Sequence, residues 1–133
     1  MRARGIFRRM AAVRERELVE RWRDLLTTYN AVANALDQTL QREHGIGLSE
    51  FEALDRLIDA GDKCVLKVLG SDMYLSQSAL SRAVDRLERQ GLVARSMCDN
   101  DRRSIYVAPT AAGRQRHADA SSTRSRILAD HLG

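Results

Sequence analysis

The sequence predicts a mainly α-helical domain that carries one small β-hairpin. Three observations support this fold class: apolar residues recur at helical spacing over most of the chain, one segment alternates like a strand, and turn-forming residues separate these patterns. The 133 residues suffice for one domain with a buried core. The composition, 44% hydrophobic and 30% charged, is typical of globular proteins, and the net charge of +4 favours an anionic partner only weakly.

The first predicted helix is long and runs from Glu17 to about Glu43. Apolar residues recur along it every three or four positions, and glycines at 45 and 47 are expected to end it. Residues 1–16 form a predicted basic arm outside this helix, either a frayed, disordered extension or a segment that follows phosphates.

Two shorter helices are expected next. Ser49 and Glu52 have the spacing of a capping box, which predicts the start of the second helix. Gly61 and Asp62 form a predicted turn, and an apolar run from Cys64 to Leu69 then favours a short third helix.

A fourth helix is predicted from Ser76 to Gln90, with Gly91 as its C-terminal cap. Leu80, Val84 and Leu87 form its buried stripe. The opposite face and its flanks are polar and carry Ser78, Ser81, Arg82, Asp85, Arg86 and Arg89.

The only β structure expected is a hairpin. Its first strand begins at Leu92, a charged turn covers residues 98–101, and the second strand alternates around Tyr106 until Pro109 ends it. Thr110 is expected to cap a last helix that extends to about His131.

This order of elements is that of a winged helix-turn-helix, which points to double-stranded DNA as the partner. Small side chains at the start of the fourth helix would allow close approach to base edges in the major groove. Arg82 could reach a guanine or a phosphate, and Arg86 and Arg89 would lie near phosphates. The residues predicted to meet DNA are Ser76, Gln77, Ser78, Ser81, Arg82, Arg86, Arg89, Asp101, Arg102 and Arg103.

The hairpin tip mixes both signs of charge. An arginine that enters a narrow minor groove needs to be held, and Asp101 could hold a guanidinium through a bidentate pair. Alternation alone leaves open whether Arg102 or Arg103 enters the groove. Cys98 is either a small turn residue or an exposed thiol open to oxidation.

Residues 75–114, LSQSALSRAVDRLERQGLVARSMCDNDRRSIYVAPTAAGR, resemble the signature of the MarR family of winged-helix transcriptional regulators. The resemblance implies a homodimer on a palindromic operator, often released by a small molecule. It also implies that Arg103 enters the minor groove with Asp101 as its partner. The sequence departs from the family at Pro109, where a leucine is usual, and it stops at Gly133 without the usual further C-terminal helix that clasps the partner.

On this resemblance the DNA-binding lobe covers about 48–109, within a single domain of residues 17–133, and the dimerisation helices cover about 17–44 and 110–131. Trp22, Tyr29 and His44 either line a pocket for a small aromatic effector or serve ordinary packing. No cofactor, metal site or enzyme activity is expected, because the three histidines are scattered and no catalytic motif accompanies them. No membrane segment is expected either, since no apolar run approaches the ~20 residues that span a bilayer, and the expected location is the cytoplasm. The competing interpretation is a winged-helix module for protein or RNA.

Overall fold

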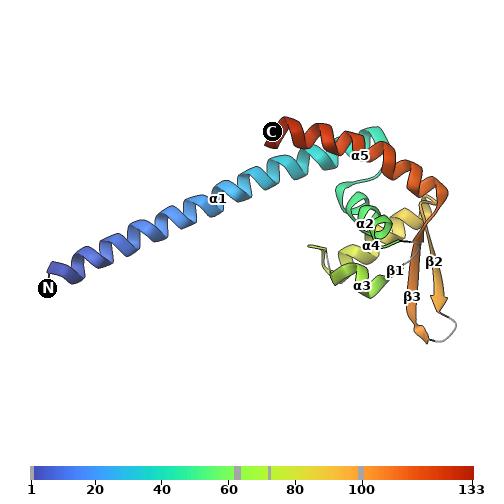
Figure 1. Cartoon of the computed structure of the whole chain (residues 1–133), viewed down its shortest axis with the longest axis horizontal. Helices are drawn as coiled ribbons and strands as arrows, with labels where there is room; N and C mark the ends of the chain where they lie inside the picture. Colours follow the sequence, from blue (N-terminus) through green and yellow to red (C-terminus); the bar gives the residue numbers. More distant parts are fainter. Residues whose placement is uncertain (1, 62–63, 72, 99–100) are drawn as a thin grey trace. The chain divides into compact units, whose positions relative to one another are not determined.

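The computed structural model describes residues 2–61, 64–71, 73–98 and 101–133; the side chains at 2, 98 and 101–104 lie outside the description. Contacts group the chain into two units, residues 1–34 and residues 35–133. The elements are α1 (Arg2–His44), α2 (Leu48–Asp59), β1 (Cys64–Val65), α3 (Leu66–Ser71), α4 (Gln77–Arg89), β2 (Val93–Cys98), β3 (Asp101–Pro109) and α5 (Ala111–Leu132), as drawn in Figure 1. None of the described helices is both long and apolar enough to cross a membrane.

Helix α1 begins at Arg2, so the predicted start at Glu17 was too late and the predicted basic arm is helical. The physical reason is composition: residues 8–16 consist of Arg, Met, Ala, Val and Glu, and all but the valine favour a helix. The helix ends at His44 as predicted, because Gly45 takes a φ of 71° that few other residues adopt.

The N-terminus of α2 is capped differently from the prediction. The helix begins at Leu48 with Gly47 as its N-cap, and glycine has no side chain that could accept a capping hydrogen bond. The predicted capping box of Ser49 and Glu52 is therefore wrong. Instead, the Leu48 N–H donates to the Asp37 carboxylate of α1 at 2.9 Å, so a carboxylate distant in sequence stabilises the helix start.

The segment that was predicted as a single short helix begins with a strand. Cys64 and Val65 form β1, and α3 starts only at Leu66. β1 pairs antiparallel with β3, with Cys64 opposite Val107 and Val65 opposite Tyr106, which gives a three-stranded sheet of order β1-β3-β2. A strand of two residues shows no period of its own, so its pairing with β3 decides its conformation.

The remaining elements confirm the prediction closely. Helix α4 runs from Gln77 to Arg89, β2 and β3 form the expected hairpin, and α5 follows after Pro109 (Figure 1). The core of residues 35–133 joins the buried faces of α2, α4 and the sheet. Its largest fully buried side chains are Phe51, Leu40, Ile46, Leu54, Leu57, Leu80, Leu87, Leu92, Val84 and Val107. The core thus fixes α4 by one face and leaves its polar face to solvent.

Candidate nucleic-acid interface

The start of α4 is fixed by its own sequence. The Ser76 hydroxyl accepts a hydrogen bond from the Ala79 N–H at 3.1 Å and lies 3.2 Å from the Ser78 hydroxyl. An N-cap of this kind contributes about 1 kcal/mol to helix stability. The side chains of Leu80 and Val84 are buried one and two turns further on. The leading turn therefore presents short polar side chains outward.

The structure places most of the predicted α4 contacts on the exposed face. Ser76, Gln77 and Ser78 are exposed at the leading end, and Arg82 is exposed one turn later. Ser81 is half-buried, which leaves it at the edge of this surface. Because small side chains precede an exposed arginine, the face has the shape and charge that a major groove accepts.

Arg86 is exposed but already has a partner. Its Nη1 donates to the Glu50 carboxylate of α2 at 3.2 Å. The Arg86 side chain is 58% exposed and the Glu50 side chain only 10%, so the carboxylate is largely buried and the guanidinium reaches solvent. This pair ties α2 to α4 and partly neutralises the charge of Arg86, a residue that the sequence predicts to lie near phosphates.

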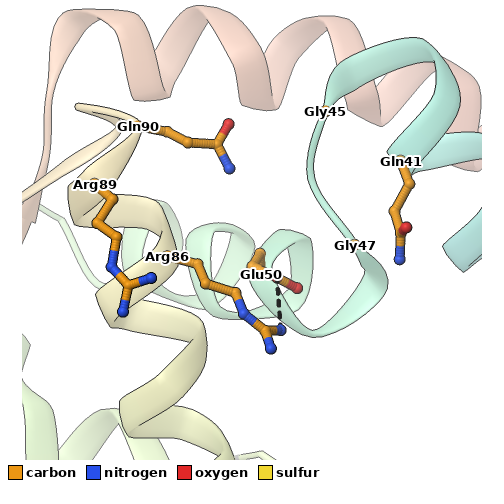
Figure 2. A pocket seen from close by; sticks show the side chains of 7 residues that line it. All are labelled: Gln41, Gly45, Gly47, Glu50, Arg86, Arg89 and Gln90. Atoms are coloured by element: carbon orange, nitrogen blue, oxygen red, sulfur yellow. Dashed lines mark hydrogen bonds and ion pairs between the residues drawn. The ribbon is translucent and has the colours of Figure 1, made fainter.

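The pair lies in an open polar cleft of about 610 Å³. Figure 2 shows Arg86 and Arg89 of α4 and the C-cap residue Gln90 on one side of the cleft, and the loop with Gly45 and Gly47 on the other. Two of the predicted phosphate contacts, Arg86 and Arg89, thus share one hollow at the end of α4.

The hairpin is tied to α4 by Arg95. Its guanidinium lies 2.6 Å from the Asp85 carboxylate and 3.7 Å from that of Glu88, one turn further along α4. Arg95 is 27% exposed, and its buried Nε has no hydrogen-bond partner among the described protein atoms. Two carboxylates on a helix and one arginine on a strand therefore hold β2 and α4 as one body.

The strands of the hairpin lie in register from Val93 opposite Pro109 to Met97 opposite Ile105. An irregularity between Met97 and Cys98 follows, and Cys98 lies opposite Asp101. The side chains of Asp101, Arg102 and Arg103 lie outside the described part, as does that of Cys98, so their predicted roles stay predictions.

Helix α5 is attached through polar contacts at its middle. Asp55 of α2 lies 2.7 Å from His117 Nε2 and 3.1 Å from Arg124 Nη1. Both partners also contact Phe51: the His117 ring stacks on it with centroids 5.5 Å apart, and the Arg124 guanidinium lies 4.9 Å from its centre. Burial alone would raise the pKa of Asp55, but the hydrogen bond to His117 and the charge of Arg124 outweigh it and hold the pKa below its ordinary value.

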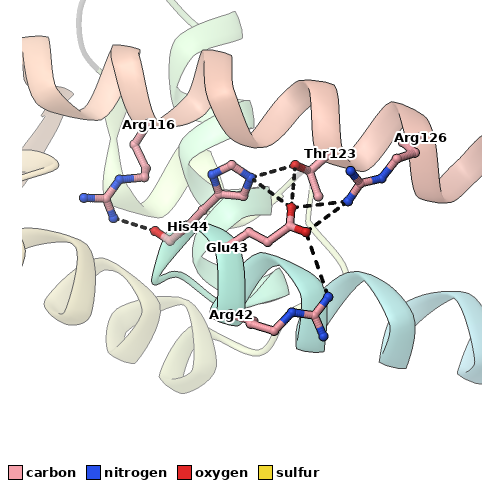
Figure 3. Close-up of polar contacts among 6 residues, drawn as sticks. All are labelled: Arg42, Glu43, His44, Arg116, Thr123 and Arg126. Atoms are coloured by element: carbon pink, nitrogen blue, oxygen red, sulfur yellow. Dashed lines mark hydrogen bonds and ion pairs between the residues drawn. The ribbon is translucent and has the colours of Figure 1, made fainter.

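A second polar cluster joins α5 to the end of α1, as Figure 3 shows. Arg126 Nη2 donates to both Glu43 carboxylate oxygens at 3.2 Å, and Thr123 donates to the same carboxylate at 3.3 Å. Desolvation would raise the pKa of Glu43, and these hydrogen bonds and the Arg126 charge lower it. Arg116 donates to the His44 carbonyl oxygen at 2.7 Å, which caps the end of α1.

The residues predicted to line an effector pocket fall into different parts of the molecule. Trp22 and Tyr29 belong to residues 1–34 and are 59% and 65% exposed. His44 belongs to residues 35–133, where its Nε2 lies 2.7 Å from the Thr123 hydroxyl. For His44 the structure gives a packing role, and the pocket itself stays a prediction.

The sequence did not reveal the ion-pair partners of three residues that organise this surface: Glu50, Asp85 and Arg95. A signal was available for Glu50, because it stands next to Phe51 at the buried side of α2, and a carboxylate there needs a partner. Among the described residues, no group of three or more His, Cys, Asp or Glu side chains could hold a metal ion.

Comparisons with known proteins bear on this surface directly. The model of the MarR family matches residues 46–105, from α2 to the second strand of the hairpin. The transcriptional regulators YwhA and YcgE of Bacillus subtilis are similar at 27% and 31% identity; the alignments cover 77% and 79% of this chain and 73% and 65% of those proteins. The crystal structure of Sco3205, a MarR family transcriptional regulator from Streptomyces coelicolor in complex with DNA, is similar with a TM-score of 0.80 at 25% identity, over 89% of this chain and 73% of that one. The segment that the family model matches contains the capped helix α4, its Arg95 tie and the start of the hairpin, so this segment is a MarR-type winged helix.

Proposed function

We propose that this chain regulates transcription by binding double-stranded DNA, with α4 in the major groove and the β2–β3 hairpin beside it. The observation that carries the proposal is the exposed face of α4, where Ser76, Gln77 and Ser78 precede Arg82. Short side chains let the helix backbone approach the bases, and an arginine one turn later can pair with guanine or phosphate. The action proposed is binding, not catalysis.

The tie between Arg95 and Asp85 supports the use of helix and hairpin together. Because both carboxylates of the tie lie on α4, the hairpin keeps its position when the helix enters a groove. Pre-positioned elements pay less ordering entropy on binding. The family relationship further supports a homodimer that reads a palindromic site, with half-sites about one helical turn apart.

Selection of bound fragments from a random DNA pool would test the proposal and reveal the symmetry of the site. On the selected site, Arg82→Ala should weaken binding by about 1–3 kcal/mol and relax base preference at one position of each half-site. Arg56→Ala, which removes an exposed arginine of α2, is the matched control and should leave affinity unchanged. If no sequence is enriched, or if Arg82→Ala binds every probe as the parent does, the proposed α4 interface is wrong. Tighter binding to a random RNA pool than to the DNA pool would favour the competing RNA-binding module.

We also propose that a small aromatic molecule releases the DNA, as the family relationship suggests. Trp22, the only tryptophan of the chain, offers a direct readout because it is one of the predicted pocket residues. An effector that weakens DNA binding should also change tryptophan fluorescence. Release of DNA without any fluorescence change would exclude a pocket beside Trp22.

A further inference from the structure

The polar cleft beside the end of α4 has a lining that suits a hydrophilic ligand. Its volume is about 610 Å³, and the seven residues that line it are two arginines, two glutamines, two glycines and one glutamate. No apolar or aromatic side chain is among these seven, whereas pockets for drug-sized molecules are lined mainly by such side chains. A ligand of this cleft is therefore held by charge and hydrogen bonds.

The α4 side of the cleft presents hydrogen-bond donors. Arg89 has no ion pair and no side-chain hydrogen bond among the described residues. Arg86 uses only Nη1, which donates to Glu50 at 3.2 Å, so its other N–H groups are available. Gln90 accepts from Arg116 through Oε1 at 3.3 Å, so its Nε2 remains a donor. Two guanidinium groups and one amide on the same side form a site for an anionic group.

The base and the opposite wall of the cleft present hydrogen-bond acceptors. Gln41 lies across the cleft from α4, as Figure 2 shows, and its Nε2 donates to Asp37 at 3.0 Å, so its Oε1 remains an acceptor. Glu50 uses Oε1 for Arg86 and keeps Oε2. A Cβ at Gly47 would stand 2.9 Å from that Oε2, so only a glycine leaves room for a ligand atom beside it. This side of the cleft therefore suits the O–H groups of a ligand.

We infer that the cleft binds a small phosphate ester that also carries hydroxyl groups, such as a sugar phosphate. A phosphate monoester has a charge of about −1.5 to −2 at pH 7 and three strong acceptor oxygens. These oxygens accept from Arg89, Arg86 and Gln90 on the α4 side, where the planar guanidinium fork matches the geometry of a phosphate. The hydroxyl groups donate to Gln41 Oε1 and Glu50 Oε2 on the other side.

Other occupants fit the cleft less well. The backbone of DNA has no hydroxyl group on its deoxyribose, so Gln41 Oε1 and Glu50 Oε2 would gain no donor from it. A ligand ammonium group at Glu50 would lie beside the Arg86 guanidinium, which already neutralises that carboxylate. A carboxylate has one acceptor oxygen fewer than a phosphate monoester for the three donors on the α4 side. A sugar phosphate uses both sides of the cleft.

Isothermal titration calorimetry of the full chain tests the inference, with glucose 6-phosphate as the probe. The parent should bind glucose 6-phosphate at least about tenfold more tightly than inorganic phosphate or glucose, because each of these two engages only one side of the cleft. Arg89→Ala should weaken binding of glucose 6-phosphate by about tenfold or more, since a charged hydrogen-bond donor is lost. Arg56→Ala is the matched control: it removes an exposed arginine of α2 outside the cleft and should bind as the parent does.

A second variant tests the acceptor side of the cleft. Gln41→Leu should weaken binding of glucose 6-phosphate about fivefold and leave binding of inorganic phosphate unchanged, because it removes an acceptor for hydroxyl groups only. Gln41 is exposed, so this variant should fold, and circular dichroism should show the helix content of the parent in all three variants.

Four results would overturn the inference. Glucose 6-phosphate could bind no more tightly than inorganic phosphate, which would make the cleft a site for an adventitious ion only, or no more tightly than glucose. Arg89→Ala could bind as the parent does, Arg56→Ala could lose as much affinity as Arg89→Ala, or Gln41→Leu could weaken both ligands equally. The titrations contain no DNA, so failure here leaves the proposed DNA-binding function standing.

Discussion

Replacing Asp55 with asparagine should destabilise the folded chain by about 2 kcal/mol at neutral pH. The Asp55 carboxylate lies 2.7 Å from His117 Nε2 and 3.1 Å from Arg124 Nη1, in a site where the three side chains are 18%, 18% and 28% exposed. A hydrogen bond to a charged group contributes about 1.5–3 kcal/mol. Asparagine keeps the shape and one acceptor but loses the charge, so roughly half of the stabilising free energy of the two contacts should be lost.

The effect should depend on pH in a defined direction. Burial raises the pKa of Asp55, but the hydrogen bond to His117 and the charge of Arg124 outweigh it, so the folded-state pKa lies below the unfolded one. The stabilisation from the carboxylate is then fully present above about pH 3.9, the value of an unperturbed aspartate, and is lost as the pH falls through the lower folded-state pKa. The difference between parent and Asp55→Asn should therefore shrink at acid pH.

Thermal unfolding followed by circular dichroism at fixed protein concentration provides the measurement. A loss of about 2 kcal/mol should lower Tm by about 8 °C at pH 7 for a chain of this size. Asp59→Asn is the control, because Asp59 is exposed on the same helix and has no ion pair among the described residues. A Tm loss no larger than that of the control, or an equal loss at pH 7 and pH 3, would refute the proposed role of the Asp55 cluster.

Two further substitutions probe the DNA-binding surface and its support. Gly113→Ala should destabilise the chain by about 2–3 kcal/mol, because an added Cβ would overlap the carbonyl group of Leu92, the residue before β2, and force α5 away from it. Urea unfolding checks this, and a loss below about 0.5 kcal/mol would contradict it. Glu50→Gln should tighten DNA binding a few-fold at low salt, because it removes the carboxylate that neutralises Arg86. Anisotropy titrations at several salt concentrations measure this, and unchanged affinity at low salt would mean that Arg86 lies away from phosphate.

Elements with local signals were predicted well from the sequence. Ser76 caps α4 and Thr110 caps α5, each accepting a hydrogen bond from the N–H three residues later. Gly91 takes a φ of 74° at the end of α4. Such caps involve residues within one turn of each other, so the sequence itself contains both partners. The exposed face of α4 followed from the same local period.

Features that depend on distant residues were missed. The Leu48 N–H is capped by Asp37, eleven positions earlier, and β1 exists only because β3 pairs with it more than forty positions later. The Arg95 tie joins two elements whose charged residues look solvated when each is read alone. Periodicity reports which side of an element is buried, but not which neighbour it meets, and that neighbour decides these contacts.

Helix α5 shows how far polar contacts can replace apolar burial, and this has a measurable consequence. Of its 22 residues, Ile127 is the only large apolar side chain that is buried; the other buried positions are Gly113, Ala120 and Thr123. Its attachment therefore depends on ion pairs such as Arg126 with Glu43, shown in Figure 3, and such pairs are weak individually and screened by salt. Helix α4 also has ion pairs, but it buries Leu80, Val84 and Leu87 within 13 residues and therefore depends on them less. We expect the protection of the α5 amides, measured as exchange rates relative to the intrinsic rates at the same pH, to fall with salt and with acid while α4 stays protected. An equal fall of protection in both helices would mean that α5 is held by contacts other than these ion pairs.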